Sequence, residues 1–224
     1  NKSIQKDQSL HILLQLIPAS NRSIIIWLQM LTKLRNDINK SANPKKASFL
    51  QRFFKTGEGE YGFGDIFVGL TVPQSRILAI KYKDLDFIDI TTLLKSQIHE
   101  ERLIALLILV HQFESQEMLQ RRIYEFYLKN TKYINNWDLV DLSSHKIIGA
   151  YLIDKPKDIL FKLSKSNNLW EKRISMIATY NFINNKMFDD ALLIAQNLIE
   201  DKNDLIQKAV GWMLREVGNR DLKT

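Results

Sequence analysis

The chain has no cysteine, only four prolines and only eight glycines among its 224 residues. Without cysteine it cannot form disulfides, a thiol nucleophile, an iron–sulfur cluster or a cysteine-based zinc site. The longest apolar run, Leu103 to Val110, is far shorter than the ~18–20 residues that cross a bilayer. No secretory signal pattern opens the sequence. We therefore expect neither a membrane-spanning helix nor a disulfide-stabilised fold.

Five of the eight glycines fall between Gly57 and Gly69, so the rest of the chain is nearly free of helix breakers. Apolar residues recur at helical spacing through most of the sequence, as in 103–113 and 205–217. The pattern predicts about eleven or twelve helices in pairs of roughly 35–45 residues, which is typical of an α-solenoid of the HEAT or armadillo kind. An irregular, compact all-α domain is the alternative.

Several short motifs predict where helices begin and end. Asn203-Asp204 is expected to open the last helix, with Gln207 reaching back to the cap, and Gly218 to close it. Thr71-Val72-Pro73 predicts another helix start, and so does Asp154 before Lys155-Pro156. The polar stretch from Asn39 to Ala47, which contains Pro44, is expected to be a loop.

Positive charge is concentrated at the N-terminal end. The net charge is +7, and residues 1–56 hold ten Lys and Arg against two Asp, whereas the remainder of the chain is close to neutral. A basic segment of this kind favours nucleic acid or an anionic membrane surface as a partner. A solvated basic face that binds nothing is the alternative.

The glycine-rich segment Lys55–Asp65 superficially resembles a phosphate-binding loop. It lacks the Gly-Lys-Ser/Thr of a Walker motif, and no strand-like run precedes it. Its acidic residues would also repel a phosphate. We therefore expect an ordered turn between helices, with glycines at positive φ.

Four segments together resemble the DNA alkylation-repair family, the bacterial alkylpurine DNA glycosylases of the AlkD type. The first is Phe54-Lys55-Thr56-Gly57 with Gly-Glu-Tyr-Gly-x-Gly-Asp65, followed by Gly69, Pro73 and Arg76. The others are Asn136-Trp137-Asp138-Leu139-Val140-Asp141, Leu169-Trp170-Glu171-Lys172-Arg173 and the helix from Ile206 to Glu216. They occur in the family's order over residues 54–221, about three quarters of the chain.

The resemblance implies a HEAT-like solenoid of about six antiparallel helix pairs, whose concave face holds duplex DNA. It implies hydrolysis of the N-glycosidic bond of N3- or N7-alkylated purines, without base flipping and without a metal or organic cofactor. We expect a single domain over residues 1–224, with basic helices in 1–56. We also expect a monomer in the bacterial cytoplasm, associated with the nucleoid.

Four residues match the catalytic positions of that family. Asp141 matches its carboxylate, Trp137 and Trp212 its two site tryptophans, and Arg173 its site arginine. A carboxylate can stabilise a developing oxocarbenium ion and position water. Indole faces attract cations, and the arginine would pair with a backbone phosphate. Taken without the family, the tryptophans could be core residues and Asp141 a cap or lysine partner, and Arg173 could stack on Trp170.

Other residues are weaker candidates for DNA contact. Phe54 and Thr71 align with an aromatic hydroxyl and a glutamine of active family members, so both polar groups are missing here. The four histidines show no metal-ligand spacing and are interpreted as surface or capping residues. The further expected DNA contacts are Lys146, Lys172, Lys208 and Arg215.

Two other functions remain open. One is a non-catalytic solenoid that binds DNA of unusual shape, and the other is a protein-interaction scaffold. Salt-sensitive DNA affinity would separate both DNA functions from the scaffold. Base release would separate the enzyme from the binder.

Overall fold

A computed structural model describes residues 19–221 of the chain, and every regular element within them is helical. The expected all-α, solenoid-like fold is confirmed, and part of the basic segment 1–56 lies outside the described residues. That residues 1–224 form one domain stays a prediction. The helices are α2 (Ala19–Lys40), α3 (Pro44–Phe53), α4 (Val72–Lys81), α5 (Phe87–Leu94), α6 (His99–Ser115), α7 (Gln120–Lys129), α8 (Trp137–Asp141), α9 (Asp158–Ser164), α10 (Leu169–Asn184), α11 (Asp189–Leu198) and α12 (Asp204–Gly218).

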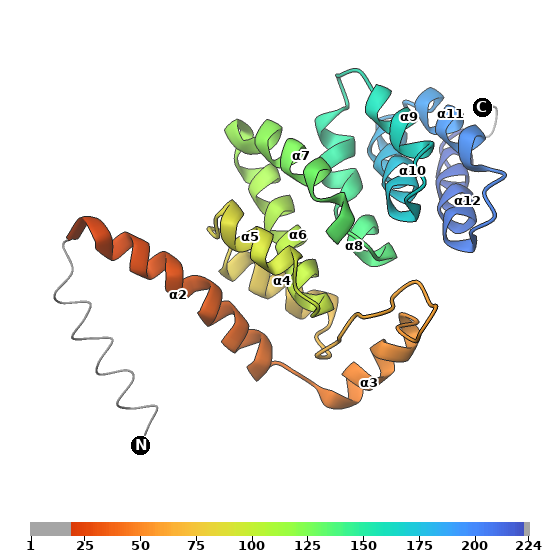
Figure 1. Ribbon diagram of the computed structural model, residues 1–224. Coiled ribbons are helices and arrows are strands. Elements are labelled where there is room, and N and C mark those ends of the chain that lie inside the picture. The colour runs from red at the N-terminus through yellow and green to blue at the C-terminus, as the bar shows by residue number, and fades with distance from the viewer. Residues whose placement is uncertain (1–18, 222–224) are drawn as a thin grey trace.

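The helices from α4 to α12 follow one another along an arc, and α3 lies on the other side of its opening (Figure 1). A π-helical turn, η3 (His145–Gly149), continues from α8, and short 3₁₀ turns flank α7 at Glu117–Leu119 and Thr131–Tyr133. Helices α6 and α10 are buried on nearly every side. This explains why apolar residues occur on all sides of these helices rather than along one stripe.

Most helix starts follow the sequence signals. The side chain of Asn203 caps α12, and Thr71 with Gln74 forms a capping box at α4. Gln207 behaves differently from the prediction, because its amide donates to the carbonyls of Ile199 and Asp201. Helix α12 ends at Gly218, as predicted.

Two predicted boundaries are wrong. The carboxylate of Asp154 accepts from its neighbour Lys155 at 2.7 Å instead of capping a helix. Helix α9 begins only at Asp158, four residues after Asp154. The loop expected over 39–47 is also shorter, because α2 runs to Lys40 and Pro44 starts α3 at its first position, where a proline costs no hydrogen bond.

The first turn of α6 fastens the preceding segments to the solenoid through buried carboxylates. Glu100 accepts from the backbone N–H groups of residues 68–70 at 2.8–3.2 Å. Glu101 holds Arg35 of α2 through two bonds of 3.0 Å. Carboxylates are favourable at a helix N-terminus, so these residues stabilise α6 while they anchor α2 and the loop.

The glycine-rich segment is the ordered turn that the sequence predicts. Gly59, Gly64 and Gly69 have positive φ. Gly69 also lies so close to the start of α3 that a Cβ there would be 2.2 Å from the carbonyl oxygen of Asn43. Only glycine fits where residue 69 passes the start of α3. This close approach sets the position of α3 relative to α6.

Candidate active site

A cavity of ≈ 420 Å³ brings together all four residues that the sequence predicts for catalysis. Its walls come from the end of α3, from α8, from α10 and from α12, which are far apart in the chain. The residues around it are Phe53, Lys55, Tyr61, Trp137, Asp141, Arg173, Asp204, Leu205, Lys208 and Trp212.

Helix α8 carries two of the four residues, one at each end. Its N-cap Asn136 is fully buried and accepts from the N–H of Trp137 at 2.8 Å. Trp137 and Asp141 lie four residues apart, so one helical turn places both on the cavity side. The indole of Trp137 stacks on Phe54, with ring centroids 5.0 Å apart and planes at 7°. Phe53 meets the same indole edge-on at 6.0 Å.

The guanidinium of Arg173, on α10, forms a bidentate ion pair with the carboxylate of Asp141. Nε donates to Oδ1 and Nη2 to Oδ2, each at 2.8 Å, and Nη1 donates to the carbonyl of Leu205. Burial raises the pKa of Asp141 above its usual value, and the hydrogen bonds and charge of Arg173 offset only part of that rise. Arg173 is 5 % exposed, so it is not a surface charge on Trp170. Its observed partners are protein groups, and the phosphate contact stays a prediction.

Two aromatic residues form the rest of the wall. Trp212 lies on α12, and its indole N–H donates to Glu216 at 3.2 Å. Tyr61, from the glycine-rich turn, also lines the cavity and has the phenolic hydroxyl that Phe54 lacks. Burial raises the pKa of the Tyr61 phenol. Sequence reasoning missed Tyr61 as a site residue, although it is part of the Gly-Glu-Tyr-Gly motif.

The expected DNA contacts do not all lie at this cavity. Lys208 lines it and pairs with Asp204 at 2.9 Å. Thr71 caps α4 and faces a second cavity. The three remaining basic residues lie elsewhere, Lys146 beside Glu114 at 3.2 Å, Lys172 beside Asp201 at 2.7 Å, and Arg215 exposed on α12, where Glu216 pairs with Arg220 instead.

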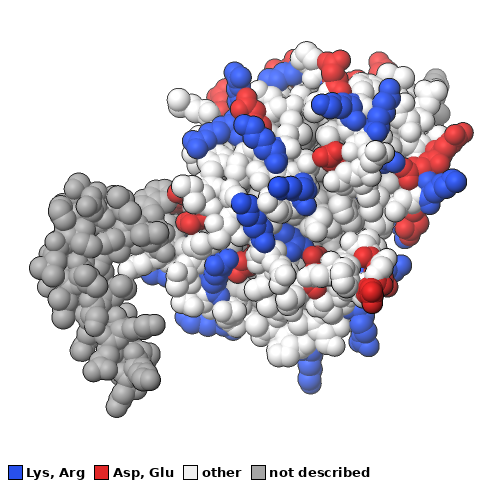
Figure 2. All heavy atoms as spheres, in the orientation of Figure 1, with Lys and Arg blue, Asp and Glu red and all other residues white. Residues whose placement is uncertain are grey.

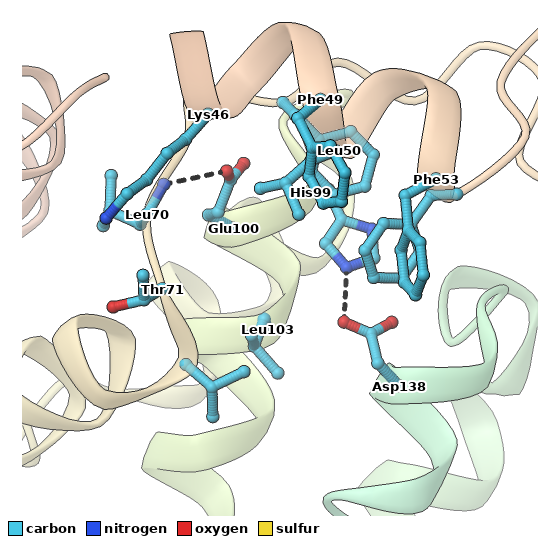
Figure 3. A pocket seen from close by; sticks show the side chains of 13 residues that line it. Lys46, Phe49, Leu50, Phe53, Leu70, Thr71, His99, Glu100, Leu103 and Asp138 are labelled. Atoms are coloured by element: carbon cyan, nitrogen blue, oxygen red, sulfur yellow. Dashed lines mark hydrogen bonds and ion pairs between the residues drawn. The ribbon is translucent and has the colours of Figure 1, made fainter. Parts of the chain in front are cut away.

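The second cavity, of ≈ 400 Å³, lies beneath α3 (Figure 3) and shares Phe53 with the first. Phe49, Leu50 and Phe53 of α3 hang over it, and the start of α6 and Asp138 of α8 border it. Phe53 lines both cavities, so it separates them. No residue of α3 is fully buried. The helix thus spans a hollow rather than packing onto the solenoid.

The interpretation of the histidines as surface or capping residues is wrong for His99 and His145. His99 is 1 % exposed and lies between Asp65 and Asp138. His145 is partly buried beside Tyr180, and burial lowers its pKa to about 4. Across residues 19–221 no cluster of three or more acidic or histidine side chains could hold a metal ion.

Positive side chains are spread over the visible face rather than gathered in one patch (Figure 2). Helix α3 and the two residues after it, at the mouth of the cavities, carry no acid and expose Lys45, Lys46, Arg52 and Lys55. Phe49 and Phe53 are 58 % and 53 % exposed beside them. In the described part of the chain, no helix is long and apolar enough to cross a membrane.

The chain is similar to known proteins in sequence and in fold. The sequence model of a family described as DNA alkylation repair enzyme matches residues 34–224. A solved structure described as a predicted DNA alkylation repair enzyme from Enterococcus faecalis superposes with a TM-score of 0.60 at 16% identity. That match covers 81% of this chain and 86% of the other. At this identity the likeness concerns the fold. No curated protein matches significantly.

Proposed function

Because the chain belongs to the family of DNA alkylation repair enzymes, we propose that it hydrolyses the N-glycosidic bond of positively charged N3- or N7-alkylated purines in duplex DNA. One observation carries the proposal. A single cavity contains a carboxylate, two indole rings and the arginine that orients the carboxylate. These are the groups that stabilise cationic species during glycosidic bond cleavage.

The chemistry needs little more than fixed negative charge. An N3- or N7-alkylated purine is already cationic and leaves as a neutral base, so it needs no strong acid. The deoxyribose left behind has oxocarbenium character, as in other glycosyl transfers. A carboxylate beside the anomeric carbon stabilises that charge and accepts a proton from the attacking water. Asp141 is the acidic residue in the cavity whose carboxylate is oriented by a buried arginine.

The neighbours of Asp141 orient its carboxylate and supply aromatic rings beside it. The fork of Arg173 fixes both carboxylate oxygens, which leaves the outer lone pairs for water or substrate. Trp137 and Trp212 line the same cavity. Cation–π attraction is worth ~2 kcal/mol or more when a site is desolvated. Both the alkylated base and the oxocarbenium ion would benefit from it.

We propose that duplex DNA lies across the opening between α3 and α12. The exposed basic residues of α3 provide phosphate contacts on one side, and Lys208 and Arg215 of α12 provide them on the other. Partly exposed Trp137 and Trp212 would meet the edge of the lesion strand at the duplex surface. The lesion would therefore react while it remains stacked.

The test is release of 7-methylguanine from a duplex under single-turnover conditions, with wild type beside Asp141→Asn. Wild type should release the base, and the variant should lose at least ~100-fold in rate, by analogy with other groups that stabilise charge in a transition state. DNA affinity should stay equal or rise, because the variant removes negative charge near phosphates. Arg121→Gln, on the exposed face of α7, is the matched control for handling and folding.

Each alternative gives a distinct result. Full activity in Asp141→Asn would refute the role of the carboxylate. No release by wild type, with DNA binding that weakens steeply as salt rises, would favour the non-catalytic DNA binder. The absence of both would favour the interaction scaffold. A 2-aminopurine beside the lesion tests stacking, since flipping would raise its fluorescence.

A further inference from the structure

A buried imidazolium links the glycine-rich loop to α8, the helix that carries two of the four catalytic candidates. His99, the first residue of α6, is 1 % exposed. Its Nε2 lies 2.8 Å from Oδ2 of Asp138 on α8, and its Nδ1 lies 3.1 Å from Oδ2 of Asp65 (Figure 3 shows the contact with Asp138). Nδ1 also lies 3.4 Å from Nη2 of Arg102, which is farther away than the carboxylate of Asp65. Because each ring nitrogen has a carboxylate as its nearest polar neighbour, both donate, and the ring carries a positive charge.

Charged groups from the glycine-rich loop, from α6 and from α8 surround His99. Asp65 belongs to the loop and also accepts from Arg102 of α6 at 2.6 Å, and Asn136 lies 3.3 Å from the same oxygen. Burial acts to lower the pKa of His99, but the charge and hydrogen bond of Asp138 and the hydrogen bond of Asp65 outweigh it. Together they raise the pKa to about 9. Arg102 opposes the rise.

The same imidazole belongs to a series of stacked rings that ends at the site tryptophan. His99 stacks on Phe67 at 4.4 Å, Phe67 on Phe54 at 4.8 Å, and Phe54 on Trp137 at 5.0 Å. His99 is therefore linked to α8 directly, through its ion pair with Asp138, and indirectly, through this stack. Helix α8 is only five residues long and cannot hold its own position.

We infer that protonated His99 is a positioning residue for α8, and that its ion pair with Asp138 holds Trp137 and Asp141 where the proposed reaction needs them. This inference rests on the proposed function. Asp138 precedes the catalytic carboxylate by three residues and points away from it, into the cluster with His99. Loss of the ion pair removes a restraint on the start of α8. The hydrogen bonds of Arg173 to Asp141 still hold the other end of the helix.

Arg102 supplies a matched control. Both His99 and Arg102 are buried cations that pair with Asp65, but only His99 reaches Asp138. His99→Gln and Asp138→Asn should each lower the single-turnover rate roughly 10–100-fold at pH 7, since a displacement of about 1 Å can cost that much. Arg102→Gln should lower the melting temperature without lowering the rate of the folded protein. Affinity for undamaged duplex should change less than about threefold in all three.

The pH profile separates positioning from mere stability. The folded pKa of His99 is raised, so its contribution is complete below about pH 6.5 and is lost as pH rises through about 9. Wild-type rate should fall on the alkaline side in that range. Arg102→Gln should move this limb to higher pH, because it removes a charge that opposes the imidazolium. His99→Gln should abolish it.

The indole N–H signal of Trp137, assigned with Trp137→Phe, gives a readout independent of activity. It should titrate with the imidazole of His99 in wild type and shift in His99→Gln and Asp138→Asn but not in Arg102→Gln. An unmoved signal, or an equal loss of rate in Arg102→Gln, would overturn the inference. If wild type releases no base but the Trp137 signal behaves as described, the proposed function fails and the positioning of α8 stands.

Discussion

Replacement of Arg173 by glutamine tests most directly how the site keeps its carboxylate in place. The side chains of Arg173 and Asp141 are 6% and 16% exposed. Removal of one partner of such a buried pair costs about 3–5 kcal/mol. Protonation of Asp141 can relieve part of this cost, so we expect the lower end of the range. For a chain of this size that corresponds to a fall of roughly 6–12 °C in melting temperature.

The effect on activity has a distinct signature. Without the guanidinium the pKa of Asp141 rises further, because Arg173 is the main group that holds it down. The acid limb of the single-turnover rate should therefore move to higher pH. The plateau rate should fall roughly 10–100-fold as the carboxylate loses its orientation. Arg173→Lys should restore the positive charge but not the bidentate hydrogen bonds. Its plateau rate should therefore lie between those of wild type and Arg173→Gln.

The assay is base release from 7-methylguanine duplex between pH 5 and 8, below the melting temperature of each variant. Circular dichroism at each pH shows that the variant is folded. A folded Arg173→Gln with the wild-type plateau and acid limb would refute the reasoning. A large loss of affinity for undamaged duplex would show instead that Arg173 contacts phosphate.

Two further predictions concern the fold and the chemistry. Gly69→Ala should lower the free energy of unfolding in urea by at least ~2 kcal/mol, because the residue has positive φ and its Cβ would collide with Asn43. Gly211→Ala is the control, because a Cβ there meets nothing within 4 Å, and it should be neutral or slightly stabilising. Uracil should not be released by the wild-type protein in the base-release assay, because the cavity holds no residue assigned to protonate a neutral leaving base; efficient uracil release would contradict the mechanism.

The sequence predicts helices well where periodicity and caps agree, and poorly where a polar side chain has two possible partners. Asn203 caps α12, and its side-chain oxygen accepts from the N–H of Leu205 at 2.9 Å. Asp154 has the same capping potential, but Lys155 takes its carboxylate. At Pro44 the sequence suggested a loop, although a proline at the first position of a helix leaves the helix intact.

The candidate site follows the same logic. Trp137 and Asp141 could be paired from their spacing on one helical turn, and the family motifs brought Arg173 and Trp212 to them. His99 could not be found in this way, because its two acidic partners lie 34 and 39 residues away in the chain. Tyr61 reaches the cavity only because the glycine-rich turn folds back beneath α8 and α12, which no local pattern indicates.

The cavity draws its walls from near both ends of the described chain, since Phe53 is the last residue of α3, Lys55 lies two residues beyond it and Trp212 belongs to α12. Neighbouring helix pairs in such a fold stabilise each other only locally, so the ends open at a lower free-energy cost than the middle. Every partial opening of either end removes a wall of the site while α6 and α10 remain folded. Heat or denaturant should therefore abolish the activity of this protein before the whole chain unfolds. The cavity reports the integrity of the whole arc, because it exists only while both ends are closed.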